Sequence, residues 1–466
     1  MGNIKRFVKY YSPYKKIFVF DMLCAFTAAG VDLLFPIVVR FLLNEAIVQG
    51  AGASVSLIIR IGIMLLGLYI IQYGCNYFVT TWGHIMGARM EHDMRNDLFN
   101  HLQKLSFSFY DNSKTGQLMS RIVNDLFDIS EVAHHGPEEI FISLIKILGS
   151  FFILLSIDWK LTLIVFAFIP PMTLFAYIYN KKMRSVFMRN KQKIADVNSQ
   201  LEDSISGVRV VQSFSNEHIE SEKFRHGNRE FLHTKEESYN YMGKFFSGIV
   251  FFQGIIYVVT VIAGALFMKI DSISSSDLVA YLLYINTLLN PIRTLINFTE
   301  QFQKGMTGFE RFQEILNTEP DIIDKNNAIE LKDIKGIEFR NVSFKYEADN
   351  YVLQNIDLVV NPGETVALVG PSGGGKSTIC SLIPRFYEVT EGSILIDGVD
   401  IRDVKLKSLR KHIGIVQQDV YLFAGSVRDN IRYGKPDASE EEIIEAAKRA
   451  NAHDFIMELE NGYDTY

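Results

Sequence analysis

Six long apolar segments occupy most of the first 302 residues of this 466-residue chain. They run over residues 17–43, 55–82, 137–157, 161–179, 245–270 and 278–302. Each approaches or exceeds the ~20 residues that a helix needs to cross the hydrocarbon core of a bilayer. The buried helices of a large soluble protein would not supply six such runs, and the mean hydropathy of +0.11 is high for a soluble enzyme. The sequence therefore predicts an all-α membrane domain with six transmembrane helices.

The distribution of Lys and Arg predicts how these helices are oriented. The N-terminal residues 1–16 contain five, and the two long connections, 83–136 and 181–244, contain five and twelve. The three short connections contain none, one and one: residues 44–54, 158–160 and 269–277. Because basic residues concentrate on the cytoplasmic side of a membrane, we expect both termini and both long connections in the cytoplasm.

The two long connections are predicted to be helical rather than disordered. Each carries apolar residues at spacings of three and four, which is the period of one helix face. These residues are Met90, Met94, Leu98, Leu102 and Leu105 in the first connection, and Ile194, Val197, Leu201, Ile205 and Val208 in the second. The simplest geometry extends the membrane helices into the cytoplasm, with turns near residues 111–116 and near Ser206 and Gly207. A cytoplasmic domain could act on the membrane part at these tips.

Two ionisable residues, Asp32 and Lys146, lie deep inside predicted spans. An ionisable group within the membrane is a functional candidate by default. A structural contact between helices explains each residue at least equally well. The sequence leaves both alternatives open.

The other informative stretch follows a short apolar run at residues 365–369. Residues 370–377 read G-P-S-G-G-G-K-S, which is the G-x-x-x-x-G-K-[ST] pattern of a phosphate-binding loop. Glycines allow several backbone N–H groups to point at phosphate oxygens, and a helix that starts after Gly375 adds the positive end of its dipole. Lys376 can reach the outer phosphates, and the Ser377 hydroxyl can coordinate Mg²⁺. An accidental glycine-rich turn would not have a strand before it and an apolar helix after it.

We therefore predict that this loop binds a nucleoside triphosphate. Its predicted binding residues are Gly370, Pro371, Ser372, Gly373, Gly374, Gly375, Lys376, Ser377 and Thr378.

The domain organisation follows from these two features. We expect a transmembrane domain at residues 1–310, a polar linker at 311–335 and a nucleotide-binding domain at 336–466. The last domain reads as a partial α/β fold, with one helix predicted at 439–450 from the capping-box spacing of Ser439 and Glu442. Its predicted strands are residues 337–346, 352–360, 365–370, 393–397 and 413–417.

Composition excludes several classes of function. The net charge of −6 does not indicate nucleic acid as a partner. The three cysteines, Cys24, Cys75 and Cys380, have no pair spacing, so they indicate neither a disulfide framework nor a zinc site. The basic N-terminus is followed by an apolar segment long enough to span, so no cleavable signal peptide is predicted.

Four further stretches connect these features to a known family. They are F-Y-D with K-T-G-Q-L-M-S-R and N-D within residues 109–125, G-V-R-V-V-Q-S-F at 207–214, N-V-S-F-K-Y at 341–346, and V-Q-Q-D with L-F-A-G-S-V-R-D-N-I within 416–431. Together with six spans and a fused phosphate-loop domain, they resemble the ATP-binding cassette (ABC) exporters, and most closely the bacterial multidrug and lipid half-transporters. The resemblance covers essentially the whole chain.

The resemblance implies roles for individual residues. Tyr346 matches the tyrosine that stacks on adenine, and its flat ring suits that role. Gln418 matches the glutamine that meets Mg²⁺ together with Ser377, so ATP and Mg²⁺ are the expected cofactors. The tips of the two long connections match the loops that couple both domains, with Lys114, Thr115, Gly116, Gly207 and Val208 as candidates.

The resemblance also implies a mechanism. Such half-transporters work by alternating access in a homo- or heterodimer in the cytoplasmic membrane, surrounded by lipids, and export amphipathic small molecules or lipids. ATP sandwiched between two cassettes closes the coupling tips, and hydrolysis resets them, with Lys376, Mg²⁺ and loop N–H groups stabilising the γ-phosphate charge. Neither the substrate nor the choice between homo- and heterodimer can be read from the sequence.

One departure from the family pattern matters. The Leu-Ser-Gly-Gly-Gln signature, the catalytic Glu and the switch His of these cassettes do not occur in this sequence, so no catalytic residue is assigned. We interpret the sequence as that of an exporter truncated before the signature, and expect its strands to leave apolar surface uncovered. The alternative is an ATP-binding, non-hydrolysing membrane subunit with a regulatory or dominant-negative role.

Overall fold

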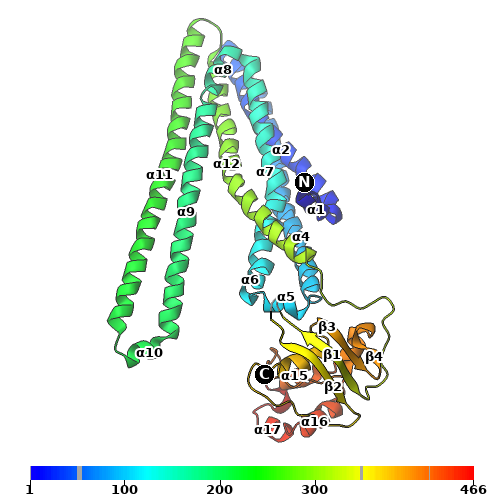
Figure 1. Ribbon diagram of the computed structural model, residues 1–466. Coiled ribbons are helices and arrows are strands. Elements are labelled where there is room, and N and C mark those ends of the chain that lie inside the picture. The colour runs from blue at the N-terminus through cyan, green and yellow to red at the C-terminus, as the bar shows by residue number, and fades with distance from the viewer. Residues whose placement is uncertain (1, 50–54, 347–349, 419) are drawn as a thin grey trace. The chain divides into compact units, whose positions relative to one another are not determined.

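The computed structural model describes residues 2–49, 55–346, 350–418 and 420–466 (Figure 1). It divides into two compact units, Met1–Asp321 and Ile322–Tyr466. The last helix of the first unit continues through Asn317, into the stretch predicted as linker. Part of the predicted connection 44–54, residues 50–54, lies outside the described residues, as does Asp419 of the glutamine-loop stretch.

The first unit is built from helices. The long ones are α2 (Lys15–Gln49), α3 (Val55–Phe78), α4 (His84–Leu102), α7 (Leu126–Ile157), α9 (Ile169–Ser206), α11 (Glu217–Lys269) and α12 (Ser275–Asn317). The short ones are α1 (Gly2–Lys9), the 3-10 helix η1 (Ser12–Tyr14), α5 (Phe107–Asp111), α6 (Thr115–Ser120), α8 (Trp159–Phe166) and α10 (Val208–Ser213). The π-helical turns η3 (Val79–Gly83) and η4 (Arg121–Asp125) join α3 to α4 and α6 to α7 without a break. The prediction that the long connections are helical is confirmed.

Within the described residues, five helical stretches are long and apolar enough to cross a membrane, by length and composition. They are Ser12–Glu45, Val55–Leu102, Thr115–Ile157, Trp159–Ser206 and Glu217–Lys269. These contain the first four predicted spans and all but the last residue of the fifth. The sixth, residues 278–302, lies within α12, which is not one of the five, so the count of six remains a prediction.

Helix α12 is less apolar because it lies among other helices rather than facing outward. Tyr281 and Tyr284 are both fully buried. The Tyr281 hydroxyl lies 2.7 Å from Thr162 Oγ1 and donates to the Leu154 carbonyl, while the Tyr284 hydroxyl donates to the Leu33 carbonyl. A helix enclosed by protein can carry such polar groups because its neighbours satisfy them.

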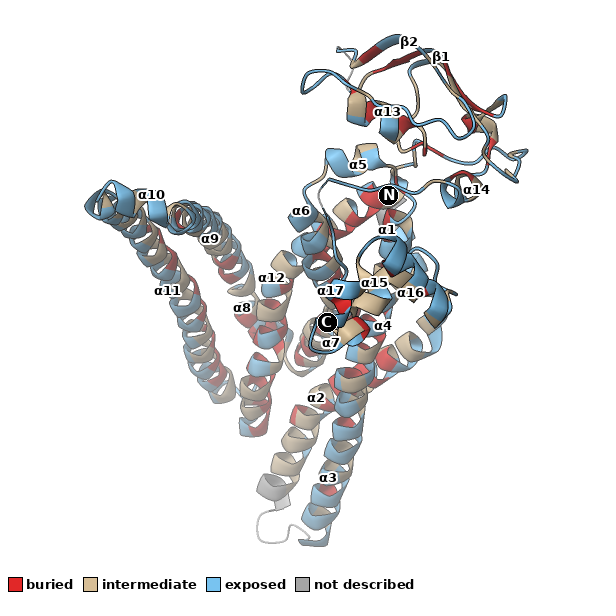
Figure 2. Ribbon diagram, turned by 90° about the horizontal axis from the view of Figure 1, so that it is seen from below, coloured by how far each residue is buried: buried red, intermediate tan, exposed pale blue. Residues whose placement is uncertain are grey.

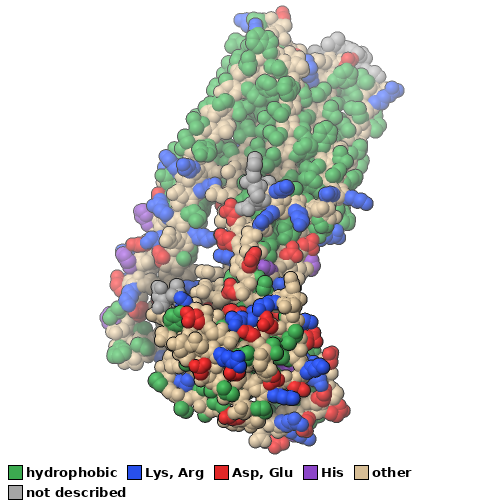
Figure 3. Space-filling view, turned by 45° about the vertical axis from the view of Figure 1, so that its right-hand side comes forward, with side chains coloured by type: hydrophobic (Ala, Val, Ile, Leu, Met, Phe, Trp, Pro, Cys, Tyr) green, Lys and Arg blue, Asp and Glu red, His purple; other side chains and the backbone are tan. Residues whose placement is uncertain are grey.

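Exposed apolar side chains cover the outer faces of the other long helices. Figure 2 shows buried residues gathered along α7 and α12, whereas α3 is mostly exposed. On α3, Ile63 and Ile70 are 65% and 63% exposed. Figure 3 shows hydrophobic side chains gathered over one part of this surface, with charged side chains beyond it. A surface of this kind requires a hydrocarbon solvent, which makes the chain a multi-pass membrane protein.

Close contact between α12 and α7 depends on small residues. A Cβ atom on Gly305 would lie 2.5 Å from Val132 Cγ2 and 2.8 Å from the Asp128 carbonyl oxygen. One on Gly308 would lie 3.2 Å from the Asp125 carbonyl oxygen. Glycine therefore lets the two backbones approach, as small residues do between membrane helices.

The second unit contains a four-stranded antiparallel sheet in the order β2-β1-β3-β4. Its strands are β1 (Ile337–Phe344), β2 (Leu353–Val360), β3 (Glu391–Ile396) and β4 (Val399–Asp400). Phe339, Val342 and Ile394 form part of the core beneath it. Before β1, Ile329 bridges to Val404, so the segment that follows the first unit already packs on this one.

Two predicted strands are wrong, because residues 365–370 and 413–417 form no strand in the structure. An extended segment becomes a strand only when a neighbour pairs with its N–H and C=O groups, and no described segment does so for either stretch. Their apolar residues remain open to solvent: Val369 is 90% exposed and Ile415 49%.

Short helices complete the second unit. They are α13 (Lys376–Leu382), η5 (Ile401–Asp403), α14 (Leu406–Lys411), α15 (Val427–Arg432), α16 (Glu440–Arg449), α17 (His453–Met457) and η6 (Gly462–Asp464). The predicted capping box is confirmed at α16, where Ser439 accepts from the Glu442 N–H and Glu442 accepts from the Ser439 N–H. Ile443, Ala447, Ile456 and Tyr463 form a hydrophobic cluster of their own.

We expect Gly305→Ala to destabilise the membrane unit by about 1–3 kcal/mol, because the new methyl group meets a backbone carbonyl that cannot rotate away. Thermal unfolding of the detergent-solubilised protein, followed by intrinsic fluorescence, measures the effect. Gly67→Ala on α3 is the matched control, since nothing lies within 4 Å of a Cβ there. Equal melting temperatures for the two variants would contradict the close packing of α12 on α7.

Candidate functional site

The glycine-rich loop leads directly into α13, as its sequence predicts. Gly375 is the N-cap of this helix and adopts a left-handed conformation with φ of 80°. A Cβ atom at this position would also lie 2.5 Å from Leu353 Cδ2 on β2. Both the backbone conformation and the close approach of the sheet therefore require glycine here. The end of the loop therefore passes close to β2.

Lys376 lies over the loop rather than pointing away from it. Its Nζ donates to the carbonyl oxygens of Gly370, at 3.1 Å, and Pro371, at 2.7 Å. The ammonium group thus lies within the turn formed by residues 370–375. Ser377, the next residue of α13, is exposed. A cation and a hydroxyl at the start of a helix form the chemistry that recognises phosphate and its metal ion.

Tyr346 belongs to the same neighbourhood, although 24 residues separate it from the start of the loop. Its hydroxyl lies 3.1 Å from Thr378 Oγ1 on α13. Its ring meets Phe344 and Tyr387 edge-on, with centroids 4.8 Å and 5.1 Å away. The ring is held from the side while Tyr346 remains half exposed. This arrangement leaves aromatic surface available beside the loop.

Gln418 is not brought to the loop. It is exposed and, within the part of the chain that the structure describes, makes no hydrogen bond to residues 370–378.

The segment after Gln418 is held by hydrogen bonds of Asn430. The Asn430 side chain accepts from the Phe423 N–H and donates to the carbonyls of Phe423 and Ser426. The Ser426 hydroxyl donates to Asp429 and lowers the pKa of that carboxyl.

The candidate coupling residues lie at helix tips. Lys114 is the N-cap of α6, which Thr115 and Gly116 begin, and Gly207 immediately precedes α10, which Val208 begins. Figure 1 shows α5, α6 and α10 at the same end of the first unit, opposite α8. The tips predicted from turn residues are therefore short helices that cap the long rods.

Asp32 and Lys146 form an ion pair with one another. Lys146 Nζ on α7 lies 2.5 Å from Asp32 Oδ2 on α2, and Gln72 on α3 donates to Asp32 Oδ1 at 2.7 Å. Three helices are therefore linked by one polar cluster. Of the two alternatives left open by the sequence, the structure shows the contact between helices.

A large basic cavity opens within the first unit, between α9, α11, α12 and the helices around η4. Its volume is about 1690 Å³. The lining contains seven basic side chains, Arg121, Lys181, Arg184, Lys191, Lys235, Lys304 and Arg311, against three acidic ones, Asp125, Asp128 and Glu300. Arg311 forms a bidentate ion pair with Asp125, at 2.6 Å and 2.7 Å. Five of these basic residues lie in the two long connections and contributed to the predicted orientation, but nothing in the spacing of the seven indicates that they converge.

Comparisons with known proteins agree on one family. Residues 18–292 match the model of the ABC transporter transmembrane region, and residues 353–463 match that of the ABC transporter. Two similar proteins come from Bacillus subtilis (strain 168). One is the uncharacterized ABC transporter ATP-binding protein YwjA, 42% identical over 99% of this chain and 80% of its own length. The other is the putative multidrug export ATP-binding/permease protein YgaD, 36% identical over 100% of this chain and 81% of its own.

A third relative is named for a lipid. The ATP-dependent lipid A-core flippase of Syntrophus aciditrophicus (strain SB) is 37% identical over 100% of this chain and 77% of its own length. All three relatives therefore align with both units.

The ion pair between α2 and α7 generates a prediction. Lys146→Met should destabilise the membrane unit by about 1–3 kcal/mol, because it leaves the Asp32 carboxylate without its cation between helices. The double variant Asp32→Asn with Lys146→Met should recover most of that loss, as thermal unfolding of all four proteins in the cycle would show. Additive losses would indicate that the two residues do not stabilise one another.

Proposed function

This chain belongs to the ABC transporters, a family of ATP-hydrolysing translocases, and has a transmembrane region fused to an ATP-binding domain; on that premise we propose that it exports amphipathic small molecules or lipids across the cytoplasmic membrane. The observation that carries the proposal is the phosphate loop at the start of α13, on the same chain as five helices able to cross a membrane. An ATP-driven pump requires both parts, a nucleotide site and a membrane unit, and this chain combines them.

In the proposed site, residues 370–378 hold the phosphates of ATP. The N–H groups of the loop and the start of α13 face the phosphate oxygens, and Lys376 exchanges its carbonyl partners for the outer phosphates. The Tyr346 ring stacks on adenine, supported by its contact with Thr378. Mg²⁺ would neutralise phosphate charge, with the exposed Ser377 hydroxyl as one ligand and Gln418 as a second, predicted one.

The proposed coupling runs through the helix tips. Residues 114–116 and 207–208 lie at the ends of rigid helices, so a movement applied there is carried along the rods to the membrane spans. We place these tips, the N-terminus and the nucleotide domain in the cytoplasm, on the distribution of basic residues. A second half-transporter subunit, identical or different, completes the pump.

The cavity supports a substrate with a negatively charged or polar head. Its lining has four more basic than acidic side chains, from the seven and three named above, and includes the apolar Phe187, Met188 and Ile194. The anionic head of an amphiphile complements the basic side chains, and its apolar tail complements the apolar ones. The relative named as a lipid A-core flippase supports the same class.

The alternative function is ATP binding without hydrolysis, in a regulatory or dominant-negative subunit. The names of the relatives, which refer to multidrug export and lipid flipping, favour transport. An assay of ATP-dependent uptake of a fluorescent anionic lipid into inside-out vesicles separates the two functions. Uptake by the product of the whole gene that exceeds that of empty vesicles supports export. Nucleotide binding without uptake by that product supports the alternative. The whole gene product is required because no catalytic residue is assigned within residues 1–466.

Lys376→Ala should weaken ATP binding by about tenfold or more, because it removes a charged hydrogen-bond donor from the phosphate loop. Fluorescent-nucleotide titration of the purified chain in nanodiscs measures the affinity. Lys407→Ala, which removes an exposed lysine of α14 in the same unit, should leave it unchanged. Should both variants bind ATP as the unmodified protein does, the phosphate loop would be wrongly assigned.

Tyr346→Ala should weaken ATP binding by about 1–3 kcal/mol, the value of a base–aromatic stack. Binding of inorganic triphosphate should barely change, because it has no base. Tyr346→Phe keeps the ring and removes only the contact with Thr378, so it should retain most of the affinity for ATP. Equal weakening for ATP and triphosphate would show that Tyr346 supports the fold rather than adenine.

A further inference from the structure

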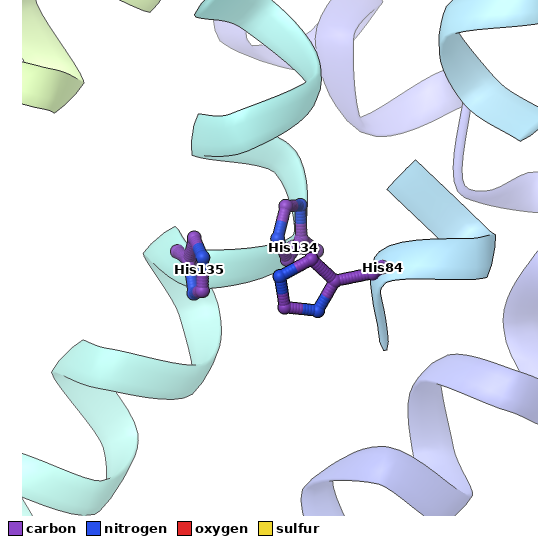
Figure 4. A group of neighbouring side chains, drawn as sticks. All are labelled: His84, His134 and His135. Atoms are coloured by element: carbon purple, nitrogen blue, oxygen red, sulfur yellow. The ribbon is translucent and has the colours of Figure 1, made fainter. Parts of the chain in front are cut away.

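Three histidines of the first unit meet where α4 begins beside α7, and none of them lines the basic cavity. The ring nitrogens of His84, His134 and His135 that could act as ligands all lie within 4.8 Å of one another. Figure 4 shows the His84 ring extending toward His134, with His135 from the neighbouring position of α7 beside them. The ring centroids are 4.3 Å apart for His84 and His134, and 4.0 Å apart for His134 and His135. Nothing in the spacing of these histidines along the chain predicts the cluster.

The hydrogen bonding of His134 decides which of its nitrogens is available. Its Nδ1 lies 2.8 Å from the backbone carbonyl oxygen of Ser130. Because a carbonyl oxygen only accepts, Nδ1 carries the proton of the neutral ring and Nε2 keeps a free lone pair. Within the described part of the chain this Nε2 has no hydrogen-bond partner, although His134 is only 3% exposed.

A buried acceptor without a partner costs free energy. Metal-bound histidines characteristically donate their other N–H to a backbone carbonyl or carboxylate, which fixes the ring. His134 already makes that bond. Gly87 on α4 makes room for it, since a Cβ atom there would lie 2.8 Å from His134 Nδ1 and 3.3 Å from the Ser130 carbonyl oxygen. The packing of the two helices therefore holds the His134 ring in an orientation that leaves Nε2 without a hydrogen-bond partner.

Two carboxylates add negative charge to this neighbourhood. The oxygens of Glu131 lie 4.0 Å from His134 Nε2 and 3.8 Å from His135 Nε2. Asp21 of α2 lies beside Gly83, the residue before His84, with its Oδ1 3.4 Å from the position of a Cβ there. Both carboxylate oxygens of Asp21 are buried and have no hydrogen-bond partner among the described residues. A bound cation would offset both carboxylates.

We propose that His84, His134 and His135 bind one divalent transition-metal ion of the zinc class, with Glu131 at the fourth position. Imidazole nitrogens suit zinc, copper and nickel. Tetrahedral zinc with Zn–N distances of 2.0–2.1 Å requires ligand nitrogens about 3.3 Å apart, so modest side-chain rotation brings these nitrogens together. His84 is exposed, which provides a path for the ion to enter.

The ion joins two helices that belong to different predicted spans. His84 lies just after the second span, which ends at Trp82, and His135 just before the third, which begins at Pro137. Metal binding therefore stabilises the contact of α4 with α7. This inference does not depend on the nucleotide site or on the transported substrate.

The experiment uses the full chain in nanodiscs, purified through a tag without histidines and passed over chelating resin. Zn²⁺ is titrated by calorimetry, and Co²⁺ reports the coordination geometry through its visible absorption. We expect one Zn²⁺ per chain, an absorption spectrum of tetrahedral Co²⁺, and a melting temperature that rises when Zn²⁺ is added.

Three variants test the ligands one at a time. His84→Ala and His135→Ala remove side chains that are not fully buried, so both should fold. His134→Asn retains a donor for the Ser130 carbonyl and removes Nε2. Each should weaken Zn²⁺ binding by more than about tenfold, since loss of an outer-shell partner alone costs 10–100-fold. His92→Ala on α4 is the matched control and should bind as the unmodified protein does.

Two results would overturn the proposal. One is the lack of stoichiometric Zn²⁺ binding by the unmodified chain. The other is binding that persists unchanged in His84→Ala and His135→Ala, which would mean an adventitious ion on surface histidines only. In either case the three rings would be a packing cluster.

Discussion

Inside a bilayer, backbone N–H and C=O groups cannot form hydrogen bonds to water. The structure of the membrane unit depends on this constraint. Each span must satisfy its own N–H and C=O groups, and a helix does so without help from neighbours. Because the hydrogen bonds of a helix are internal, the helix can continue beyond the membrane surface into water. At about 1.5 Å per residue, the 53 residues of α11 extend roughly 80 Å, well beyond a hydrocarbon core of about 30 Å. The same constraint that produces the spans thus produces rods that reach α10 and α6.

The interior of this unit is held together by different forces from those of a soluble core. Lipid is as apolar as leucine, so the helices gain little from hiding apolar side chains. Within the spans they associate instead through polar contacts such as Asp32 with Lys146. Beyond the predicted spans, Gly305 and Gly308 let α12 approach α7 closely, and Arg311 pairs with Asp125. These contacts hold α2, α7 and α12 in one arrangement. In the proposed transport cycle, the helices that move must leave such contacts intact or exchange them.

Both the proposed substrate cavity and the proposed metal site are built from polar groups near the ends of the predicted spans. The basic cavity and the histidine cluster both lie in regions where helices leave the predicted spans. There, side chains can be partly enclosed by protein and still reach water. Such positions allow basic residues to meet a charged head group, and histidines to meet a metal ion, without the cost of burying charge in hydrocarbon.

The sequence by itself determined five helical stretches able to cross a membrane, their long extensions, the glycine-rich loop that ends at Gly375, and the capping box of α16. Each of these depends on residues close together in the chain, whose periodicity or backbone requirement is visible locally. The tertiary structure alone decided which distant groups meet. It paired Asp32 with Lys146, placed Tyr346 against Thr378, and gathered His84 with His134 and His135. It also left residues 365–370 and 413–417 without a strand, because β-pairing requires a partner that local sequence cannot supply.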